Sequence, residues 1–235
     1  MNENQPTYKL QEVTKEVKGP KENLIILNNI SFHIQQQESI AIIGASGSGK
    51  TTLLHLLGGL DSPTSGKILF QNEDISDYNW EKKAVFRNNN IGFIFQFHHL
   101  LFEFNTIENV AMPAIISGQS KKNAFEQAYE ILNLVGLIDQ AYQPVATLSG
   151  GERQLAAISR ALIKKPQVVL ADEPTGDLDR NTGEKVGNIL LQINDQIKTT
   201  LVVVTHNIEL ANKMERKFQL YSGELYESNE IDSSR

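Results

Sequence analysis

The sequence contains no cysteine and no long apolar run. Without cysteine, the 235-residue chain has neither a disulfide framework nor a thiolate metal site, and thiol redox chemistry is excluded. No stretch approaches the roughly 18 to 20 apolar residues that a membrane-spanning helix needs. Residues 1–6 lack the basic start and apolar core of a signal peptide. We therefore expect any link to a membrane to be made through a partner or through a surface patch.

An excess of positive charge is also missing. The chain has 22 Lys and Arg against 28 Asp and Glu, a net charge of -6, which argues against a protein that binds DNA or RNA through its phosphates. With 40% hydrophobic and 21% charged residues, the composition is otherwise ordinary for a globular protein. Its length predicts one large domain, or one domain with a subdomain.

A glycine-rich stretch lies between two apolar segments. Residues 39–43 (SIAII) precede it and residues 53–57 (LLHLL) follow it, which predicts a strand, a loop and a helix in that order. Glycines let backbone N–H groups converge on one point, and the helix adds the positive end of its dipole there. The stretch fits G-x-x-x-x-G-K-[ST] and predicts a polyphosphate site made by Gly44, Ala45, Ser46, Gly47, Ser48, Gly49, Lys50, Thr51 and Thr52.

Several side chains have predicted roles in phosphate chemistry. Lys50 would reach the terminal phosphates, and the Thr51 hydroxyl would coordinate a magnesium ion that bridges them. Two acids follow the apolar strand predicted at residues 168–171. Asp172 would help to hold the same ion, and Glu173 would orient or deprotonate the attacking water. Two acids after a strand can also be a solvated loop, but the upstream phosphate loop favours the catalytic interpretation.

A second candidate anion site is the Ser-Gly-Gly sequence at a predicted helix start, residues 149–151. Backbone N–H groups and the helix dipole would both favour a negative charge there. Ser149 and Glu152 also have the spacing of a capping box, which an ordinary capped helix would show. The two phosphate-site elements elsewhere in the chain favour the anion site.

The order of elements predicts an α/β fold. Strands that are apolar throughout alternate with helices, which is typical of a parallel sheet covered on both faces. The predicted apolar strands are residues 39–43, 91–95, 168–171 and 201–204. Partly alternating strands at residues 26–34 and 67–70 add antiparallel structure. We predict further helices at 106–116, 120–135, 149–164 and 181–197, a hairpin at 218–225, and a turn at the triple asparagine 88–90.

This pattern divides the chain into one domain with polar ends. We predict a polar N-terminal segment at residues 1–23, a single domain at 24–227 and a polar tail at 228–235. Within the domain, residues from about 97 to 160 would form a helical subdomain.

Six motifs, in this order, resemble those of the nucleotide-binding subunits of ABC transporters: residues 44–52, Gln96, 148–154, 170–174, 177–179 and His206. The resemblance covers about residues 24–225. It implies a P-loop NTPase core with a mainly parallel sheet, an antiparallel β subdomain and a helical subdomain. It also implies ATP and Mg²⁺ as cofactors, and ATP hydrolysis coupled to transport.

The resemblance implies a dimer and assigns roles to side chains. Two subunits would pair head to tail, so that one subunit acts in trans on the γ-phosphate held by the other through Ser149, Gly150, Gly151 and Glu152. By resemblance, Glu173 is the general base, His206 senses the γ-phosphate, Gln96 links magnesium to a membrane subunit, and Asp177 and Asp179 line the dimer seam. The alternative for His206 is a histidine hydrogen-bonded in the core.

A narrower resemblance lies in residues 95–101 (FQFHHLL) and 108–113 (ENVAMP). These stretches resemble ABC subunits that power lipoprotein release at the bacterial inner membrane, with macrolide-exporter-type and FtsE-type regulatory complexes as alternatives. In the family this region contacts the membrane subunit, which implies integral membrane partners and a peripheral position on the cytoplasmic face. The alternative is that Phe97 and residues 100–102 are core and that the histidines are ordinary surface residues.

One family feature is absent from its usual place. Many members stack an aromatic ring on adenine about ten residues before the position of Leu27, where this chain has Val17. The nearest upstream aromatic, Tyr8, lies too early. Because base stacking contributes roughly 1 to 3 kcal/mol, we predict weak discrimination between ATP and GTP.

Overall fold

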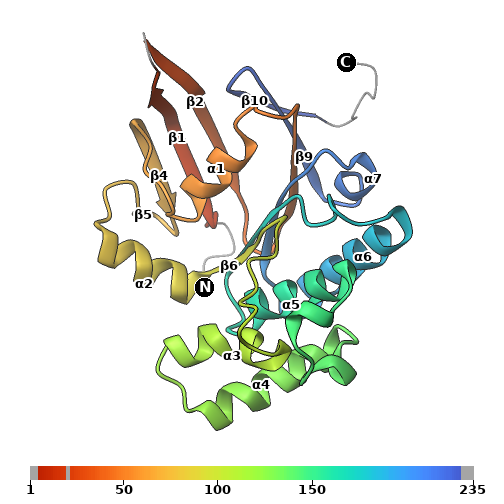
Figure 1. The fold of residues 1–235 in the computed structure, drawn as a ribbon. Coiled ribbons are helices and arrows are strands. Elements are labelled where there is room, and N and C mark those ends of the chain that lie inside the picture. Colours follow the sequence, from red (N-terminus) through yellow and green to blue (C-terminus); the bar gives the residue numbers. More distant parts are fainter. Residues whose placement is uncertain (1–4, 20–21, 229–235) are drawn as a thin grey trace. The chain divides into compact units, whose positions relative to one another are not determined.

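The computed structural model describes residues 5–19 and 22–228. The chain divides into two units, one of residues 1–87 with 200–235 and one of residues 88–199 (Figure 1). The predicted polar tail lies outside the described residues except for Ser228, as do residues 1–4, 20 and 21 of the predicted N-terminal segment.

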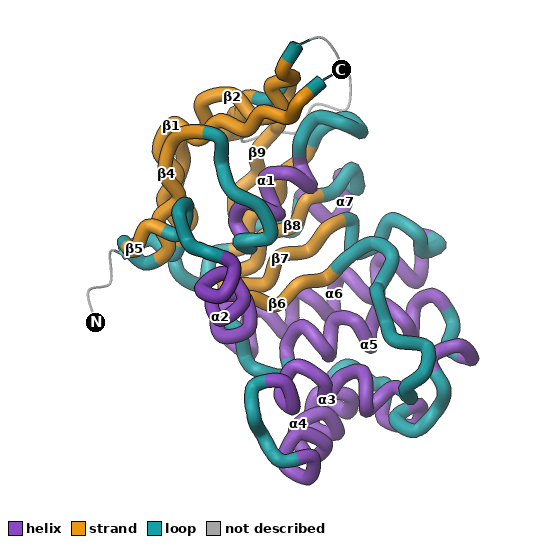
Figure 2. Tube along the Cα trace, turned by 60° about the vertical axis from the view of Figure 1, so that its left-hand side comes forward, coloured by secondary structure: helices purple, strands orange, loops and turns teal. Residues whose placement is uncertain are grey.

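An antiparallel sheet in the first unit has the strand order β2-β1-β4-β5, and these strands lie side by side in Figures 1 and 2. The strands are β1 (Tyr8–Lys18), β2 (Asn23–Ile34), β4 (Ser65–Phe70) and β5 (Glu73–Asp74). The antiparallel strands predicted at 26–34 and 67–70 are confirmed as parts of β2 and β4.

Strand β1 corrects the prediction that residues 1–23 only precede the domain. It pairs antiparallel with both β2 and β4, and Tyr8, Leu10 and Val13 on it are buried. The register shifts between Leu10 and Val13, where Glu12 has a φ of 52°. This bulge inserts an extra residue, so Val13 returns to the buried face and the simple alternation of a strand is lost from the sequence.

A second sheet carries the phosphate loop of the first unit. Strand β3 (Ser39–Ile43) pairs in parallel with β8 (Thr200–Val204) and with β9 (Arg216–Tyr221), and β10 (Glu224–Glu227) pairs antiparallel with β9. All five residues of β8 are buried, as a strand covered on both faces requires. The predicted apolar strands and the predicted hairpin are confirmed. Helices α1 (Lys50–Leu57) and α7 (Ile208–Ala211) complete this part.

Helix α2 (Trp80–Asn90) includes residues 88–90. The prediction of a turn at these residues is therefore wrong. The last three residues of the helix are asparagines, whose local propensity does not favour a helix. Tertiary contacts decide the outcome: Phe86 packs against Phe70 with ring centroids 5.0 Å apart, and Arg87 donates to the Gly59 carbonyl at 2.7 Å.

The second unit combines two parallel strands with four helices. Strand β6 (Ile91–Ile94) pairs in parallel with β7 (Val168–Asp172). Figure 2 shows α3, α4 and α5 gathered together, and the helices are α3 (Thr106–Ile116), α4 (Lys121–Leu134), α5 (Gly150–Leu162) and α6 (Arg180–Ile197). Short 3-10 turns span Ile138–Gln140 and Val145–Thr147.

The predicted helices of this unit are confirmed. Residues next to the helices in the sequence supply the caps of α3 and α4. Asn105 and Glu108 form a capping box before α3, and the Ser120 side chain accepts the Asn123 N–H before α4. Gly136, with a φ of 74°, follows Val135, the C-cap residue of α4. Left-handed glycine at this position is the usual end of a helix.

Candidate functional site

The phosphate loop joins β3 to α1 and requires two of its glycines. Gly49 precedes α1 with a φ of 102°, and a Cβ on it would lie 2.9 Å from Leu27 Cδ2. A Cβ on Gly44 would lie 2.4 Å from the Leu220 carbonyl oxygen and 2.6 Å from Ser48 Oγ. Any other residue at either position would displace the neighbouring backbone or side chains.

Two polar groups of the loop fit an anionic ligand. The Lys50 ammonium donates to the carbonyls of Gly44 at 2.8 Å and Ala45 at 3.1 Å, so it is held against the loop. Ser48 Oγ is buried and has no hydrogen-bond partner among residues 5–19 and 22–228. A buried hydroxyl without a partner is costly, and a phosphate oxygen would supply the partner. The loop residues therefore fit a polyphosphate.

His206 lies at the same sheet edge as the phosphate loop. Ile42 on β3 is in register with Val204 on β8, and the Thr205 N–H donates to the Ile42 carbonyl at 3.1 Å. Because the strands are parallel, the residues that follow them emerge together. His206 is exposed, which contradicts the alternative of a core histidine.

In the second unit, β6 and β7 bring Gln96 and Glu173 together. Ile94 is in register with Ala171, and Gln96 and Glu173 each lie two residues beyond this pair. A Cβ on Gly176 would lie 3.3 Å from Glu173 Cβ and 3.6 Å from Gln96 Nε2. Gln96 Nε2 also donates to Asp177 Oδ1 at 2.9 Å. The structure therefore gathers three of the predicted site residues in one place.

The backbone at Glu173 is strained. Its φ of 46° is in the left-handed region, and its carbonyl accepts the Gly176 N–H at 3.0 Å. A residue other than glycine in such a conformation costs about 1 to 3 kcal/mol, and such residues cluster at functional sites. Asp172, directly before it, is the last residue of β7.

Asp179 has a structural role that the sequence analysis did not assign. Its carboxylate accepts the N–H groups of Asn181 and Thr182, both at 3.1 Å, and so begins α6. Hydrogen bonds from Thr182 hold the pKa of Asp179 below its usual value. Asp179 is therefore the N-cap residue of α6.

Residues 149–152 form the capping box that the sequence left as an alternative. Glu152 Oε2 accepts the Ser149 N–H and hydroxyl, both at 2.7 Å, and Ser149 Oγ accepts the Glu152 N–H at 3.3 Å. The Ser149 hydrogen bonds lower the pKa of Glu152. A Cβ on Gly151 would lie 2.5 Å from Thr182 Cγ2, so this glycine lets α5 and α6 approach closely. The cap and the close packing exist independently of any anion.

The residues after Gln96 divide between surface and core. Phe97 and Phe102 are 73% and 61% exposed, and Leu101 is also exposed, whereas Leu100 is buried. The alternative that Phe97 and residues 100–102 are all core is therefore wrong for three of the four. The described residues include no helix long and apolar enough to cross a membrane.

Tyr8 is excluded as a base-stacking residue. Its side chain is fully buried in the first unit, its hydroxyl donates to the Leu57 carbonyl at 2.8 Å, and its ring packs on Phe70 at 5.1 Å. Val17, where the family often has an aromatic, is 42% exposed.

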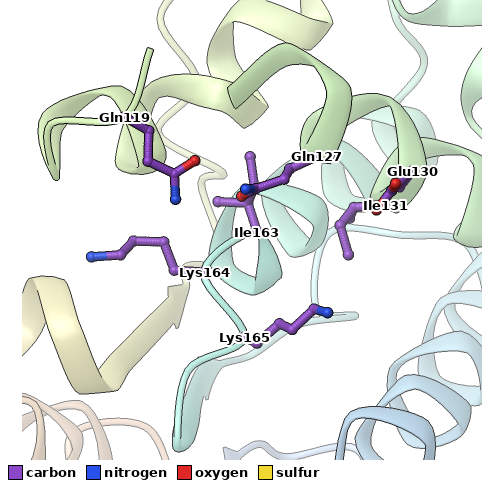
Figure 3. Close-up of a pocket in the computed structure, with 7 residues that line it drawn as sticks. All are labelled: Gln119, Gln127, Glu130, Ile131, Ile163, Lys164 and Lys165. Carbon is purple, nitrogen blue, oxygen red and sulfur yellow. The ribbon is translucent and has the colours of Figure 1, made fainter. Parts of the chain in front are cut away.

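A cavity of about 400 Å³ in the second unit contains none of the predicted site residues. Figure 3 shows the side chains that line it, which come from the loop after α3, from α4 and from the residues directly after α5: Gln119, Gln127, Glu130, Ile131, Ile163, Lys164 and Lys165. No group of three or more His, Cys, Asp or Glu side chains in the described part of the chain could hold a metal ion.

Residues 27–176 match the family described as ABC transporter, and the chain belongs to that family. The prediction of an α/β ABC ATPase fold is confirmed, and the chain is an ATPase that binds nucleotide. It is 55% identical over 224 residues to the lipoprotein-releasing system ATP-binding protein LolD of Nitratidesulfovibrio vulgaris, covering 95% of this chain and 96% of that protein. LolD of Wigglesworthia glossinidia brevipalpis is 48% identical over 226 residues, which cover 96% of this chain and 99% of the relative.

Solved structures agree with this assignment. The dimeric post-hydrolysis state of the ATP-binding cassette MJ0796 bound to ADP and Pi has a TM-score of 0.87 and 37% identity, and it covers 94% of this chain and 97% of that chain. A second dimeric structure of MJ0796, described as a bacterial ABC transporter cassette, also has a TM-score of 0.87, with 36% identity.

Proposed function

We propose that this chain is the ATP-hydrolysing subunit of an ABC complex that releases lipoproteins from the bacterial inner membrane toward the outer membrane. The observation that carries the proposal is its identity of 55% with a LolD protein over almost the full length of both chains. The exposed apolar side chains directly after Gln96 support it, because a surface that contacts a membrane subunit needs such a patch.

The nucleotide would be held by residues 44–52, whose loop fits a polyphosphate. Thr51, Gln96 and Asp172 are the proposed ligands of Mg²⁺, which would neutralise charge on the phosphates when bound.

Three side chains would carry the hydrolysis. Lys50 would neutralise charge on the terminal phosphates, Glu173 would accept a proton from the attacking water, and His206 would contact the γ-phosphate. Two observations support these roles: the strained backbone of Glu173 beside Gln96, and the position of His206 at the sheet edge that carries the loop.

The working form would be a homodimer in which each nucleotide lies between two copies. Ser149, Gly150, Gly151 and Glu152 of one copy would act on the γ-phosphate held by the other, and Asp177 and Asp179 would line the seam. The dimeric MJ0796 cassette, 37% identical to this chain, supports this arrangement.

The partners would be integral membrane subunits of the LolC and LolE type, with the ATPase peripheral on the cytoplasmic face of the inner membrane. A macrolide-exporter-type complex or an FtsE-type regulatory complex would use the same ATPase chemistry with a different membrane subunit. The stretches 95–101 and 108–113 favour lipoprotein release.

The test is to capture the membrane partner with a variant that binds ATP without hydrolysing it. We expect Glu173→Gln with ATP to retain, from solubilised inner membranes, a membrane protein that carries lipoprotein, identified by mass spectrometry. The matched control is the double variant Lys50→Ala with Glu173→Gln, which should retain little. Capture of a cell-division membrane protein without lipoprotein would move the assignment to the regulatory class, and capture of no membrane protein would contradict the proposal.

A further inference from the structure

The segment of residues 95–104 has a fixed backbone and exposed apolar side chains. Phe97, Leu101, Phe102 and Phe104 are between 37% and 73% exposed. A surface loop with this much exposed apolar area is expected to collapse unless its backbone is held. The contacts that hold the backbone therefore determine the conformation in which the segment meets a partner.

Two adjacent histidines form the turn in this segment. His98 and His99 have φ values of 59° and 47°, in the left-handed region that residues with a Cβ disfavour. The His98 N–H donates to the Phe95 carbonyl at 3.1 Å, and the His99 N–H donates to the Phe97 carbonyl at 2.5 Å. Two consecutive residues in this conformation persist only when the surroundings stabilise them.

Arg160, in the last turn of α5, supplies that stabilisation. Its guanidinium donates through Nη2 to the His98 carbonyl at 2.6 Å and through Nη1 to the His99 carbonyl at 2.5 Å. The planar fork of arginine suits two neighbouring acceptors, and lysine offers no such fork. Burial lowers the pKa of Arg160, as expected for a cation drawn away from water to make these bonds.

The far end of the segment is held from α3. The Asn109 side chain is buried and accepts the Leu101 N–H at 2.7 Å, while its amide donates to the carbonyls of Leu101 at 2.9 Å and Asn105 at 3.0 Å. Around these two attachments Phe97, Leu101, Phe102 and Phe104 are exposed, whereas Leu100 is buried. The backbone is therefore preorganised before any partner binds.

A simpler role for Arg160 would be to interact with the negative end of the α5 dipole. Its two hydrogen bonds, however, go to the turn, and not to carbonyls of α5. Lys164, just beyond the helix, has the same charge and donates to the Asn88 carbonyl at 2.8 Å. A contribution to the helix dipole alone would be shared by both cations.

We propose that Arg160 is a positioning residue that fixes the His98–His99 turn, so that the 95–104 segment is shaped for the membrane subunit and is mechanically tied to the helix that begins at the Ser-Gly-Gly sequence. The inference rests on the proposed function, in which this segment contacts the membrane subunit. It adds that α5 and the 95–104 segment move together. Helix α5 begins at the Ser149 cap, and Arg160 in its last turn is hydrogen-bonded to the segment.

The first experiment measures amide hydrogen exchange of the full chain by mass spectrometry. We expect peptides that contain His98 and His99 to exchange at least ten times faster in Arg160→Ala than in the wild type, while peptides of α4 are unchanged. Methylguanidinium in the buffer should slow the exchange again, and Arg160→Lys should be intermediate. Lys164→Ala is the matched control and should leave the turn protected. Unchanged exchange at the turn in Arg160→Ala would overturn the proposal.

The second experiment measures ATP hydrolysis with the cognate membrane subunits in lipid nanodiscs. Arg160→Ala should lose most of the stimulation that these subunits give to the wild type, and Lys164→Ala should keep it. Faster exchange with full stimulation would overturn the link to the partner. If the membrane subunits do not stimulate the wild type, the proposed function fails, and the exchange result still decides whether Arg160 fixes the turn.

Discussion

Gln96 Nε2 donates a hydrogen bond to Asp177 Oδ1 at 2.9 Å, across 81 residues of sequence. Only the NH₂ end of an amide can donate to a carboxylate, so this bond fixes the orientation of the amide and leaves Gln96 Oε1 available as an acceptor. Oxygen is the atom that Mg²⁺ requires. Asp177 therefore orients the proposed metal ligand.

Removing this hydrogen bond should weaken the use of magnesium. We expect Asp177→Ala to raise the Mg²⁺ concentration for half-maximal hydrolysis about tenfold, the low end of the effect of losing such a supporting partner. Asp177→Asn retains an acceptor oxygen and should change it less. The measurement is ATP hydrolysis during a Mg²⁺ titration at constant ATP. Identical titration curves for Asp177→Ala and the wild type would show that the amide is oriented by other contacts.

Lys50 should be indispensable for hydrolysis. Replacing it by Ala removes the cation held against the loop carbonyls, so we expect no measurable turnover and weaker nucleotide binding. Lys67→Ala is the control, since the ion pair of Lys67 with Asp74 is long, at 4.0 Å, and exposed. Turnover and binding of a fluorescent ATP analogue are measured for both. Normal turnover in Lys50→Ala would refute the phosphate-loop assignment.

Glu173→Gln should separate binding from hydrolysis. The amide cannot accept a proton from water, so ATP should remain bound and should hold two copies together. Light scattering should show a mass that doubles on addition of ATP and that does not double with ADP. Hydrolysis at the wild-type rate would show that Glu173 is not the base.

Gly151 offers a test of packing in the second unit. A Cβ at this position would meet Thr182 Cγ2 at 2.5 Å, so Gly151→Ala should lower the free energy of unfolding by about 1 to 3 kcal/mol, in spite of the better helix propensity of Ala. Adding Thr182→Ser removes the clashing methyl group and should restore most of the loss. Chemical denaturation of the single and double variants measures both effects. No recovery in the double variant would mean that the cost has another origin.

The wild-type protein should discriminate weakly between ATP and GTP, and one substitution should make it prefer ATP. Tyr8 is buried, and Val17, which stands where many family members have an aromatic residue, is an exposed aliphatic residue on β1. We expect similar hydrolysis of ATP and GTP by the wild type. Val17→Tyr should favour ATP about tenfold, which corresponds to about 1.4 kcal/mol, within the range for base stacking. Strong ATP preference in the wild type would contradict this prediction.

The sequence by itself determined the local chemistry. The phosphate loop, the caps at Ser120 and Ser149, and the acids after residues 168–171 are patterns of neighbouring residues, and each folds as its neighbours require. Apolar strands such as residues 201–204 are recognisable for the same reason, because burial on both faces leaves no polar position.

The sequence could not show which distant residues meet. Strand β1 was missed because a bulge at Glu12 breaks its alternation. The end of α2 was missed because three consecutive asparagines do not favour a helix, whereas the packing of Phe86 does. Arg160 had one signal, a charge inside the apolar run AAISRAL, but nothing local indicated its acceptors.

Only the tertiary structure decided three features of the site. The register of β3 with β8 puts His206 at the edge that carries the phosphate loop, and the register of β6 with β7 puts Gln96 beside Glu173. Arg160 holds a left-handed turn that histidine would not adopt alone, which keeps Phe97 exposed while Leu100 is buried. Local preferences fix the elements, but strand register and long-range hydrogen bonds depend on contacts between residues far apart in the chain.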